Sequence, residues 1–221
     1  LPLPKKSIKD LERMIELLTA NTPNGKKISI MLEETRLNYK VTKININKDE
    51  QFKPEFKKLS PFCKIPVIID HEKNISLFES GAILIYLGDK TGKFYDKDHR
   101  TIINQWLMGQ MAYVGPLLGQ HHQFHHYNPG KSEFGEKRYF EMAKKIYKEL
   151  DERLSVSKFL AGKDYTIADI ATFPWIARHD WHDIGLKSHS NLTRWYQEIS
   201  NREAVQKGYD LLGRGEEIPK A

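Results

Sequence analysis

The sequence is poor in cysteine: Cys63 is the only one among 221 residues. A single cysteine excludes an internal disulfide framework and a CxxC redox pair. Any thiol chemistry must therefore use Cys63 or a thiol that another molecule brings. The neighbouring Lys64 is a cation of the kind that lowers a thiol pKa, but a lone cysteine is usually structural, and we do not predict Cys63 to be a nucleophile.

The chain also lacks a long apolar run. It has no stretch of about 18 apolar residues, and the opening segment Leu1–Lys6 has no apolar core of the kind found in signal peptides. We therefore expect a soluble, non-exported, cytoplasmic protein that has no membrane partner. With 39% hydrophobic residues, the chain can bury a core, and disorder is not expected.

The net charge is +6, yet the basic residues form no long block. The pairs Lys26-Lys27, Lys57-Lys58 and Lys144-Lys145 lie beside acidic residues on predicted helices, so we interpret them as solvated helix faces. Nucleic-acid binding needs a continuous basic patch or stripe. Nucleic acid is therefore not predicted as a partner.

Residues 14–90 alternate short apolar runs with helical patterns. Strands are predicted at Met14–Leu18, Tyr39–Ile44, Ile65–Ile69 and Ile75–Phe78. With helices between the strands, these residues are predicted to form a small α/β domain. An N-terminal extension, residues 1–13, precedes this domain, and a linker over residues 91–97 follows it.

From residue 98 to residue 221 the hydrophobic period is helical. Two apolar stripes are present, one of Ile103, Trp106, Leu107, Met111, Val114 and Leu118, the other of Tyr139, Ala143, Ile146, Leu150 and Leu154. Thr166 and Asp169 have the spacing of a capping box, which marks a helix start. The pattern predicts an all-α domain. Five aromatic residues that fall mostly on helical stripes are interpreted as core, namely Trp106, Tyr113, Trp175, Trp181 and Trp195.

The segment Ala20–Lys27 is predicted to be a helix start that binds an anion. Thr22 suits the N-cap, and Pro23 suits the first helical position because an N–H there has no intrahelical partner. The amides that follow favour a carboxylate or a thiolate. Considered alone, the segment is explained equally well by a helix cap without a ligand, and that alternative stays open.

Two further segments place polar or backbone groups at strand ends. Pro66 removes an amide from any sheet ladder, so it marks either an edge strand or a cis bond that presents the backbone of Ile65 to a peptide-like ligand. Glu79 and Ser80 follow a strand and open a helix. The Glu79 carboxylate suits the ammonium group of an α-amino acid, and Ser80 with the free amides of the helix start suits its carboxylate.

Together these motifs resemble the thioredoxin-fold glutathione transferases, and within them the bacterial nu class of glutathione-dependent disulfide-bond oxidoreductases. The likeness spans nearly the whole chain. It is carried by Thr22–Gly25, Gln51–Phe56, Lys64–Pro66, Phe78–Leu87 and Tyr165–Asp169. The resemblance implies an α/β N-terminal thioredoxin-like domain that binds glutathione, an all-α C-terminal helical domain, and a homodimer that acts on small disulfides.

The resemblance also implies roles for single residues. Thr22 and Asn24 stand where many transferases have a Tyr, Ser or Cys, and would stabilise a glutathione thiolate without a protein nucleophile. The glutathione-binding residues that it implies are Asn24, Gln51, Lys53, Lys64, Ile65, Pro66, Glu79, Ser80 and Arg138. In this class two reduced glutathione molecules, or one glutathione disulfide, share the site, and Arg138 would contact the second molecule.

Two alternatives to a disulfide reductase stay open. One is a conventional glutathione transferase that conjugates electrophiles, and the other is a glutathione-binding regulatory protein with little activity. The absence of Tyr, Ser or Cys at the position of Thr22 argues against the first of these.

A histidine-rich stretch contains His121, His122, His125 and His126, which form two i, i+4 pairs. This spacing suits metal chelation on one helical turn. However, the sequence places no carboxylate nearby, and in the resembling family the corresponding helix end borders the active-site cleft. We therefore predict that these histidines line a cleft and that the protein has no metal site.

Overall fold

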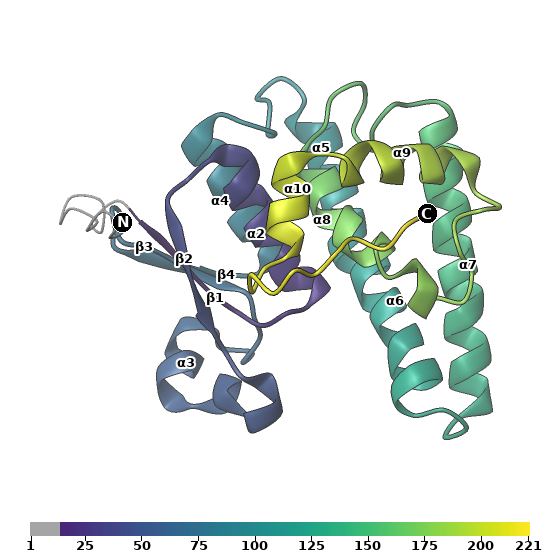
Figure 1. Ribbon diagram of the computed structural model, residues 1–221, viewed down its shortest axis with the longest axis horizontal. Coiled ribbons are helices and arrows are strands. Elements are labelled where there is room, and N and C mark those ends of the chain that lie inside the picture. Colours follow the sequence, from purple (N-terminus) through teal and green to yellow (C-terminus); the bar gives the residue numbers. More distant parts are fainter. Residues whose placement is uncertain (1–13) are drawn as a thin grey trace.

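A computed structural model describes residues 14–221, so the predicted extension over residues 1–13 lies outside the described part. A mixed α/β region and a helical region lie side by side (Figure 1). Within the described residues no helix has both the length and the apolar character needed to cross a membrane.

The mixed region is built on a four-stranded sheet in the order β2-β1-β3-β4. Its strands are β1 (Ile15–Thr19), β2 (Tyr39–Lys43), β3 (Val67–Asp70) and β4 (Ile75–Phe78). β2 runs parallel to β1, whereas β3 runs antiparallel to both β1 and β4. The four predicted strands are confirmed with small shifts at their ends. β3 begins after Pro66, which has no amide to donate to the ladder.

Helices cover both faces of the sheet. α2 (Pro23–Thr35) and α4 (Ser80–Thr91) lie on one face, and α3 (Pro54–Leu59) lies on the other (Figure 1). Successive residues of a strand point to opposite faces. Leu17 of β1 accordingly joins the main core, while Leu18 packs with Phe56 of α3 in a smaller cluster. Two 3-10 turns, η1 (Ile46–Lys48) and η2 (Glu50–Phe52), connect β2 to α3.

The helical region begins with a nearly continuous rod. α5 (Arg100–Gly109) passes through the π-helical segment η3 (Gln110–Val114) into α6 (Gly115–His122), which continues as the π-helical segment η4 (Gln123–Tyr127). The long helix α7 (Glu133–Ser155) packs against α6. Most residues of the two predicted apolar stripes are buried, and residues 98–221 contain no strand, so the all-α prediction is confirmed. The interpretation as core is wrong for Tyr113 and Trp181, whose side chains are exposed.

The centre of the helical region is α8 (Ile167–Ile176), whose residues are all buried. The predicted capping box is confirmed at its start. The Asp169 carboxylate accepts hydrogen bonds from the Thr166 amide (3.0 Å), the Leu160 amide (2.9 Å) and the Trp195 indole N–H (2.9 Å). Burial raises the pKa of Asp169, and these donors oppose that rise.

The last two helices are α9 (Ser190–Ser200) and α10 (Glu203–Tyr209), and α10 returns to pack against α2 (Figure 1). The approach is so close that a Cβ on Gly208 would lie 2.5 Å from the Cα of Ile30. The prediction that Lys26 and Lys27 are solvated is wrong, because both side chains are buried. The C-terminal segment covers Lys26, whose ammonium pairs with Glu216 and lies 3.3 Å from the centre of the Tyr209 ring.

Candidate glutathione site

The start of α2 has the structure that the sequence predicts. Thr22 is the N-cap in extended conformation, and its hydroxyl oxygen accepts a hydrogen bond from the Gly25 amide at 3.2 Å. The hydroxyl proton is left to donate elsewhere. The first turn has no acidic residue, so no carboxylate of the helix itself occupies the positive end of its dipole.

Gly25 lets this helix start lie directly against the end of β1. A Cβ at this position would lie 2.5 Å from the Ala20 carbonyl oxygen and 2.4 Å from the Thr19 hydroxyl oxygen. Any larger residue would push the first turn of α2 away from the strand. The glycine therefore determines where the amides of this turn are placed.

Asn24 is held by a residue from the helical region. Its side-chain Oδ1 accepts a hydrogen bond from the Trp175 indole N–H at 3.1 Å. Because the oxygen is used by Trp175, the amide NH₂ of Asn24 faces the other way and can donate to a ligand. The stripe pattern indicated Trp175 as core; it is buried, but it also orients Asn24 across 151 residues of sequence.

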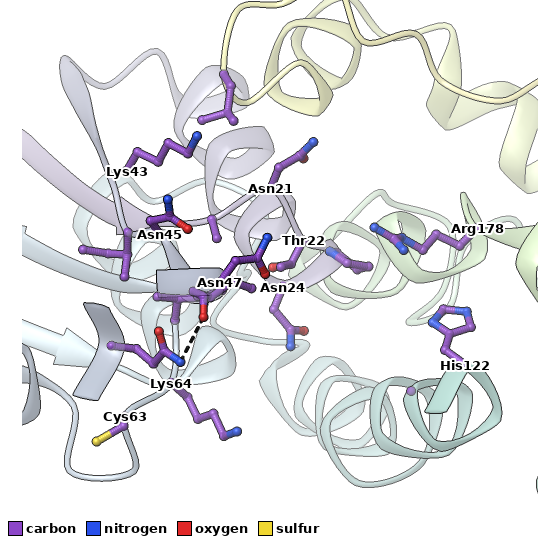
Figure 2. Close-up of a pocket in the computed structure, with 18 of the residues that line it drawn as sticks. Asn21, Thr22, Asn24, Lys43, Asn45, Asn47, Cys63, Lys64, His122 and Arg178 are labelled. Atoms are coloured by element: carbon purple, nitrogen blue, oxygen red, sulfur yellow. Dashed lines mark hydrogen bonds between the residues drawn. The ribbon is translucent and has the colours of Figure 1, made fainter. Parts of the chain in front are cut away.

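A cavity of about 740 Å³ opens at this helix start (Figure 2). Its lining includes the four cations Lys43, Lys64, Arg178 and Arg214, and among the described residues that line it none is acidic. Figure 2 shows Arg178 reaching toward Thr22 and Asn24 from the opposite wall. A concave site of this size with a uniform sign of charge suits a small anionic ligand.

Two further cavities adjoin the first and share Asn24 and Lys64 with it. One, of about 160 Å³, is lined by Ile65, Pro66, Glu79 and Ser80 as well. The sequence left open whether Pro66 marks an edge strand or a cis bond. The Ile65–Pro66 peptide bond is cis. The fold thus brings six of the nine predicted glutathione-binding residues together around this small cavity.

Gln51, Lys53 and Arg138 are placed differently. Gln51 lines the large cavity, and its amide contacts the Ile46 carbonyl oxygen at 3.4 Å. Lys53 is exposed and pairs with Glu50 at 3.7 Å. Arg138 is exposed on α7. Neither Lys53 nor Arg138 is among the described residues that line these three cavities, so their roles stay predictions.

Sequence reasoning missed a buried lysine beneath the start of α4. The Lys27 ammonium donates to the Gln110 side-chain oxygen at 2.7 Å and to the Ser80 hydroxyl at 3.3 Å. Burial lowers the pKa of Lys27 to about 7, although the charge of Glu79 opposes this. The lysine connects α2, α4 and η3, and it lines the third cavity, of about 510 Å³.

Of the four histidines that were predicted to line a cleft, His122 lines the large cavity, whereas the other three are not among the described residues that line it. The His122 ring stacks on His182 with centroids 4.8 Å apart and on Trp175 at 6.1 Å. Burial, reinforced by the positive charge of Arg178, lowers the pKa of His122 to about 3, so its ring is neutral at physiological pH. This side chain supplies an aromatic wall and no charge.

Cys63 also lines the cavity, but its sulfur points away from Thr22 and Asn24 (Figure 2). Its backbone is in the left-handed region, with φ of 54°, at the turn before Lys64. This orientation agrees with the sequence-based interpretation that Cys63 is not the nucleophile.

The two regions match the two domains of one family. Residues 15–89 match the glutathione S-transferase N-terminal domain, and residues 111–203 match the glutathione S-transferase C-terminal domain. The chain belongs to the glutathione S-transferase family. The thioredoxin-like and helical architecture expected from the motifs is thereby confirmed.

Individual members of the family are similar over most of the chain. The disulfide-bond oxidoreductase YfcG of Escherichia coli strain K12 is 41% identical over 199 residues, which cover 87% of this chain and 93% of that protein. A glutathione transferase from Burkholderia graminis, solved with two glutathione molecules bound per subunit, superposes with a TM-score of 0.85 at 38% identity and covers 92% of this chain and 90% of its own.

A glutathione transferase from Pseudomonas putida, solved with one glutathione disulfide per subunit, gives a TM-score of 0.83 at 36% identity, with 90% of this chain and 92% of that chain covered. The resemblance inferred from the motifs is confirmed at the level of sequence and of fold.

Proposed function

We propose that this protein reduces disulfide bonds with glutathione and that it does so through a bound glutathione thiolate. The observation that carries the proposal is the start of α2. There Thr22 and the NH₂ group of Asn24 face a cationic cavity, with no cysteine sulfur directed at them. Two hydroxyl or amide donors and a helix dipole lower a thiol pKa, as a glutathione thiol needs in order to react near neutral pH.

The chemistry balances with two glutathione molecules. The first thiolate attacks a disulfide, forms a mixed disulfide and releases one substrate thiolate, which takes up a proton. A second glutathione thiolate attacks the glutathione sulfur of that mixed disulfide, releasing the other substrate thiol and glutathione disulfide. Two electrons pass from the glutathione pair to the substrate. The protein contributes orientation and charge stabilisation.

The proposed placement of glutathione is the one that the resemblance to the nu class implies. Glu79 and Ser80, at the start of α4, hold the γ-glutamyl end, and the backbone of Ile65 before Pro66 pairs with the cysteinyl unit. Lys64, Gln51 and Lys53 face the glycyl carboxylate, and Arg138 contacts the second glutathione. The cations around the large cavity support this placement because glutathione is an anion.

The test is reduction of hydroxyethyl disulfide by glutathione, coupled to glutathione reductase and NADPH, with conjugation of an aryl halide measured in parallel. We expect fast disulfide turnover and weak conjugation. Strong conjugation with slow reduction would identify a conventional transferase. Tight glutathione binding without either activity would identify a regulatory protein.

The single cysteine offers a direct control on the mechanism. Cys63→Ser should retain full disulfide turnover, because the attacking thiol belongs to glutathione. Loss of turnover in a variant that still binds glutathione would assign the nucleophile to the protein itself.

We also propose that the chain is a cytoplasmic homodimer, divided into domains at residues 14–90 and 98–221 by a linker over residues 91–97. The exposed aromatic side chain of Tyr113 supports a dimer, because it borders an apolar cavity of about 510 Å³ between the α5–α6 rod and α7. Light scattering of the purified protein measures the subunit number directly.

A further inference from the structure

Four potential metal ligands meet where the end of the α6–η4 rod lies beside the segment that follows the 3-10 turn η5 (His179–Trp181). The His–Asp cluster consists of His121, His125, His126 and Asp183. One oxygen, Asp183 Oδ2, lies 3.7 Å from His121 Nε2, 3.0 Å from His125 Nε2 and 3.4 Å from His126 Nε2. The ligand atoms of His121, His126 and Asp183 all lie within 4.8 Å of one another.

The absence of a neighbouring carboxylate was the reason that the sequence predicted no metal here. Asp183 follows His126 by 57 residues, and only the packing of η5 beside η4 brings its carboxylate to the histidines. The fold therefore supplies the ligand whose absence from the local sequence argued against a metal.

A contact between histidines and a carboxylate does not explain the environment of the His121 ring. Its side chain is fully buried, yet among residues 14–221 neither ring nitrogen has a hydrogen-bond partner. Leaving a buried polar nitrogen without a partner costs about 1–3 kcal/mol. A metal ion that accepts the lone pair of Nε2 would remove this cost at that nitrogen.

We propose that the His–Asp cluster binds a zinc ion. In a tetrahedral zinc site with ligand bonds near 2.0–2.1 Å, neighbouring ligand atoms are about 3.3 Å apart. The three distances to Asp183 Oδ2 bracket this value. His125 and His126 are partly exposed, so their side chains have room to close the remaining gaps between nitrogens.

Imidazole nitrogen and carboxylate oxygen are ligands that zinc accepts in tetrahedral sites. Three neutral imidazoles and one carboxylate leave a net charge of +1 on the complex. The contact between His126 Nε2 and the Trp181 carbonyl oxygen is given up when the nitrogen turns to the metal. The site is separate from the proposed sulfur position at Thr22 and Asn24.

The role of the ion is structural. It joins η4 to the segment after η5, and both flank residues that line the large cavity: His122 and Tyr127 on one side, and Arg178 on the other. A bound zinc ion would hold this wall of the cavity in place without touching a reacting sulfur.

The test is calorimetric titration of the tag-free, metal-stripped protein with zinc. Residues 1–13 contain no histidine or cysteine, so they offer no competing site of that kind. We expect one ion per chain, and binding at least about tenfold weaker in both His126→Gln and Asp183→Asn. Asp183 has φ of 55°, and asparagine tolerates this left-handed conformation, so Asp183→Asn preserves the backbone.

A matched control is available on the surface. His99 and Asp96 form an exposed pair, with His99 Nδ1 3.0 Å from the Asp96 carboxylate, and His99 lies at the start of α5, the opposite end of the rod from η4. His99→Gln should leave zinc binding unchanged. Cobalt titration should add the intense visible bands of tetrahedral coordination, and these bands should be absent in Asp183→Asn.

Three outcomes would overturn the proposal: no stoichiometric zinc binding, equal affinity in the wild type and Asp183→Asn, or the same weakening in His99→Gln as in the cluster variants. The readout is metal binding and not turnover. A failure here therefore leaves the proposed disulfide reduction untouched, and a failure of the reductase assay leaves the zinc site untouched.

Discussion

Two helices of this protein have the same N-cap residue type but differ in whether a carboxylate of the helix fills their first turn. Both α2 and α8 have a threonine N-cap, Thr22 and Thr166, in extended conformation. Three residues later α8 has Asp169, whose carboxylate returns to the helix start and is enclosed by donors. At the same position α2 has Gly25, and its first turn has no acidic residue.

The difference shows what turns a helix start into a binding site. The first amides of every helix need acceptors from outside the helix. At α8 the chain provides the acceptor, so that helix start is filled and belongs to the core. At α2 the Thr22 hydroxyl accepts from the Gly25 amide, but no carboxylate of the helix fills its start, and the cationic cavity beside it selects for an anionic ligand.

The largest effect is expected where the helix start is filled. Asp169→Ala removes the acceptor of the Leu160 amide, the Thr166 amide and the Trp195 indole, so we expect the free energy of unfolding to fall by about 4 kcal/mol. Urea unfolding measures this loss. Asp169→Asn keeps the oxygen that serves Leu160 and Trp195 and should lose about half as much. A near-neutral alanine variant would contradict the view that α8 is closed by its own carboxylate.

The next effect concerns the open helix start. Asn24→Asp keeps the acceptor for the Trp175 indole but replaces the NH₂ donor with a negative charge, so kcat/KM for disulfide reduction should fall about 100-fold. The free energy of unfolding should stay equal or rise, because an acidic residue suits the first turn of a helix. Retained activity would show that no thiolate is bound beside Asn24.

A smaller effect is expected at the cap itself. Thr22→Ala should reduce turnover about tenfold through loss of one hydroxyl donor to the thiolate, and should lower the free energy of unfolding by about 1 kcal/mol through loss of the cap to Gly25. Thr22→Ser retains the hydroxyl and should recover both quantities. If serine restores stability but not turnover, the hydroxyl acts only as a cap.

The last prediction is a pH dependence, and it concerns the buried charges of the two helices. Burial raises the pKa of Asp169 and lowers that of Lys27 to about 7. Between pH 7 and the ordinary lysine range, the unfolded chain keeps a proton that folded Lys27 has lost. Stability should therefore rise with pH by at most about 1.4 kcal/mol per pH unit. Lys27→Met should flatten this slope in urea unfolding series; an unchanged slope would assign it to other groups.

Much of the fold and part of the site could be predicted because their signals are local. Residues within a few positions of one another determine the strand and helix periods, the Thr22 cap and the Thr166–Asp169 capping box. The Lys26-Lys27 pair was misinterpreted because its burial depends on residues that are distant in sequence. A pair of lysines beside acidic residues indicates a solvated face. Nothing local indicates that α10 and the C-terminal segment will cover Lys26, or that α4 and η3 will cover Lys27.

The sequence by itself determined the family, the two-part architecture and the helix start that awaits an anion, because these depend on short-range pattern and residue chemistry. Tertiary structure alone decided which groups meet. Trp175 orients Asn24, Lys27 lies beneath Ser80, and Asp183 joins the histidines of η4. Each pair is separated by more than 50 residues, and only the packing of helices brings such distant side chains within bonding distance.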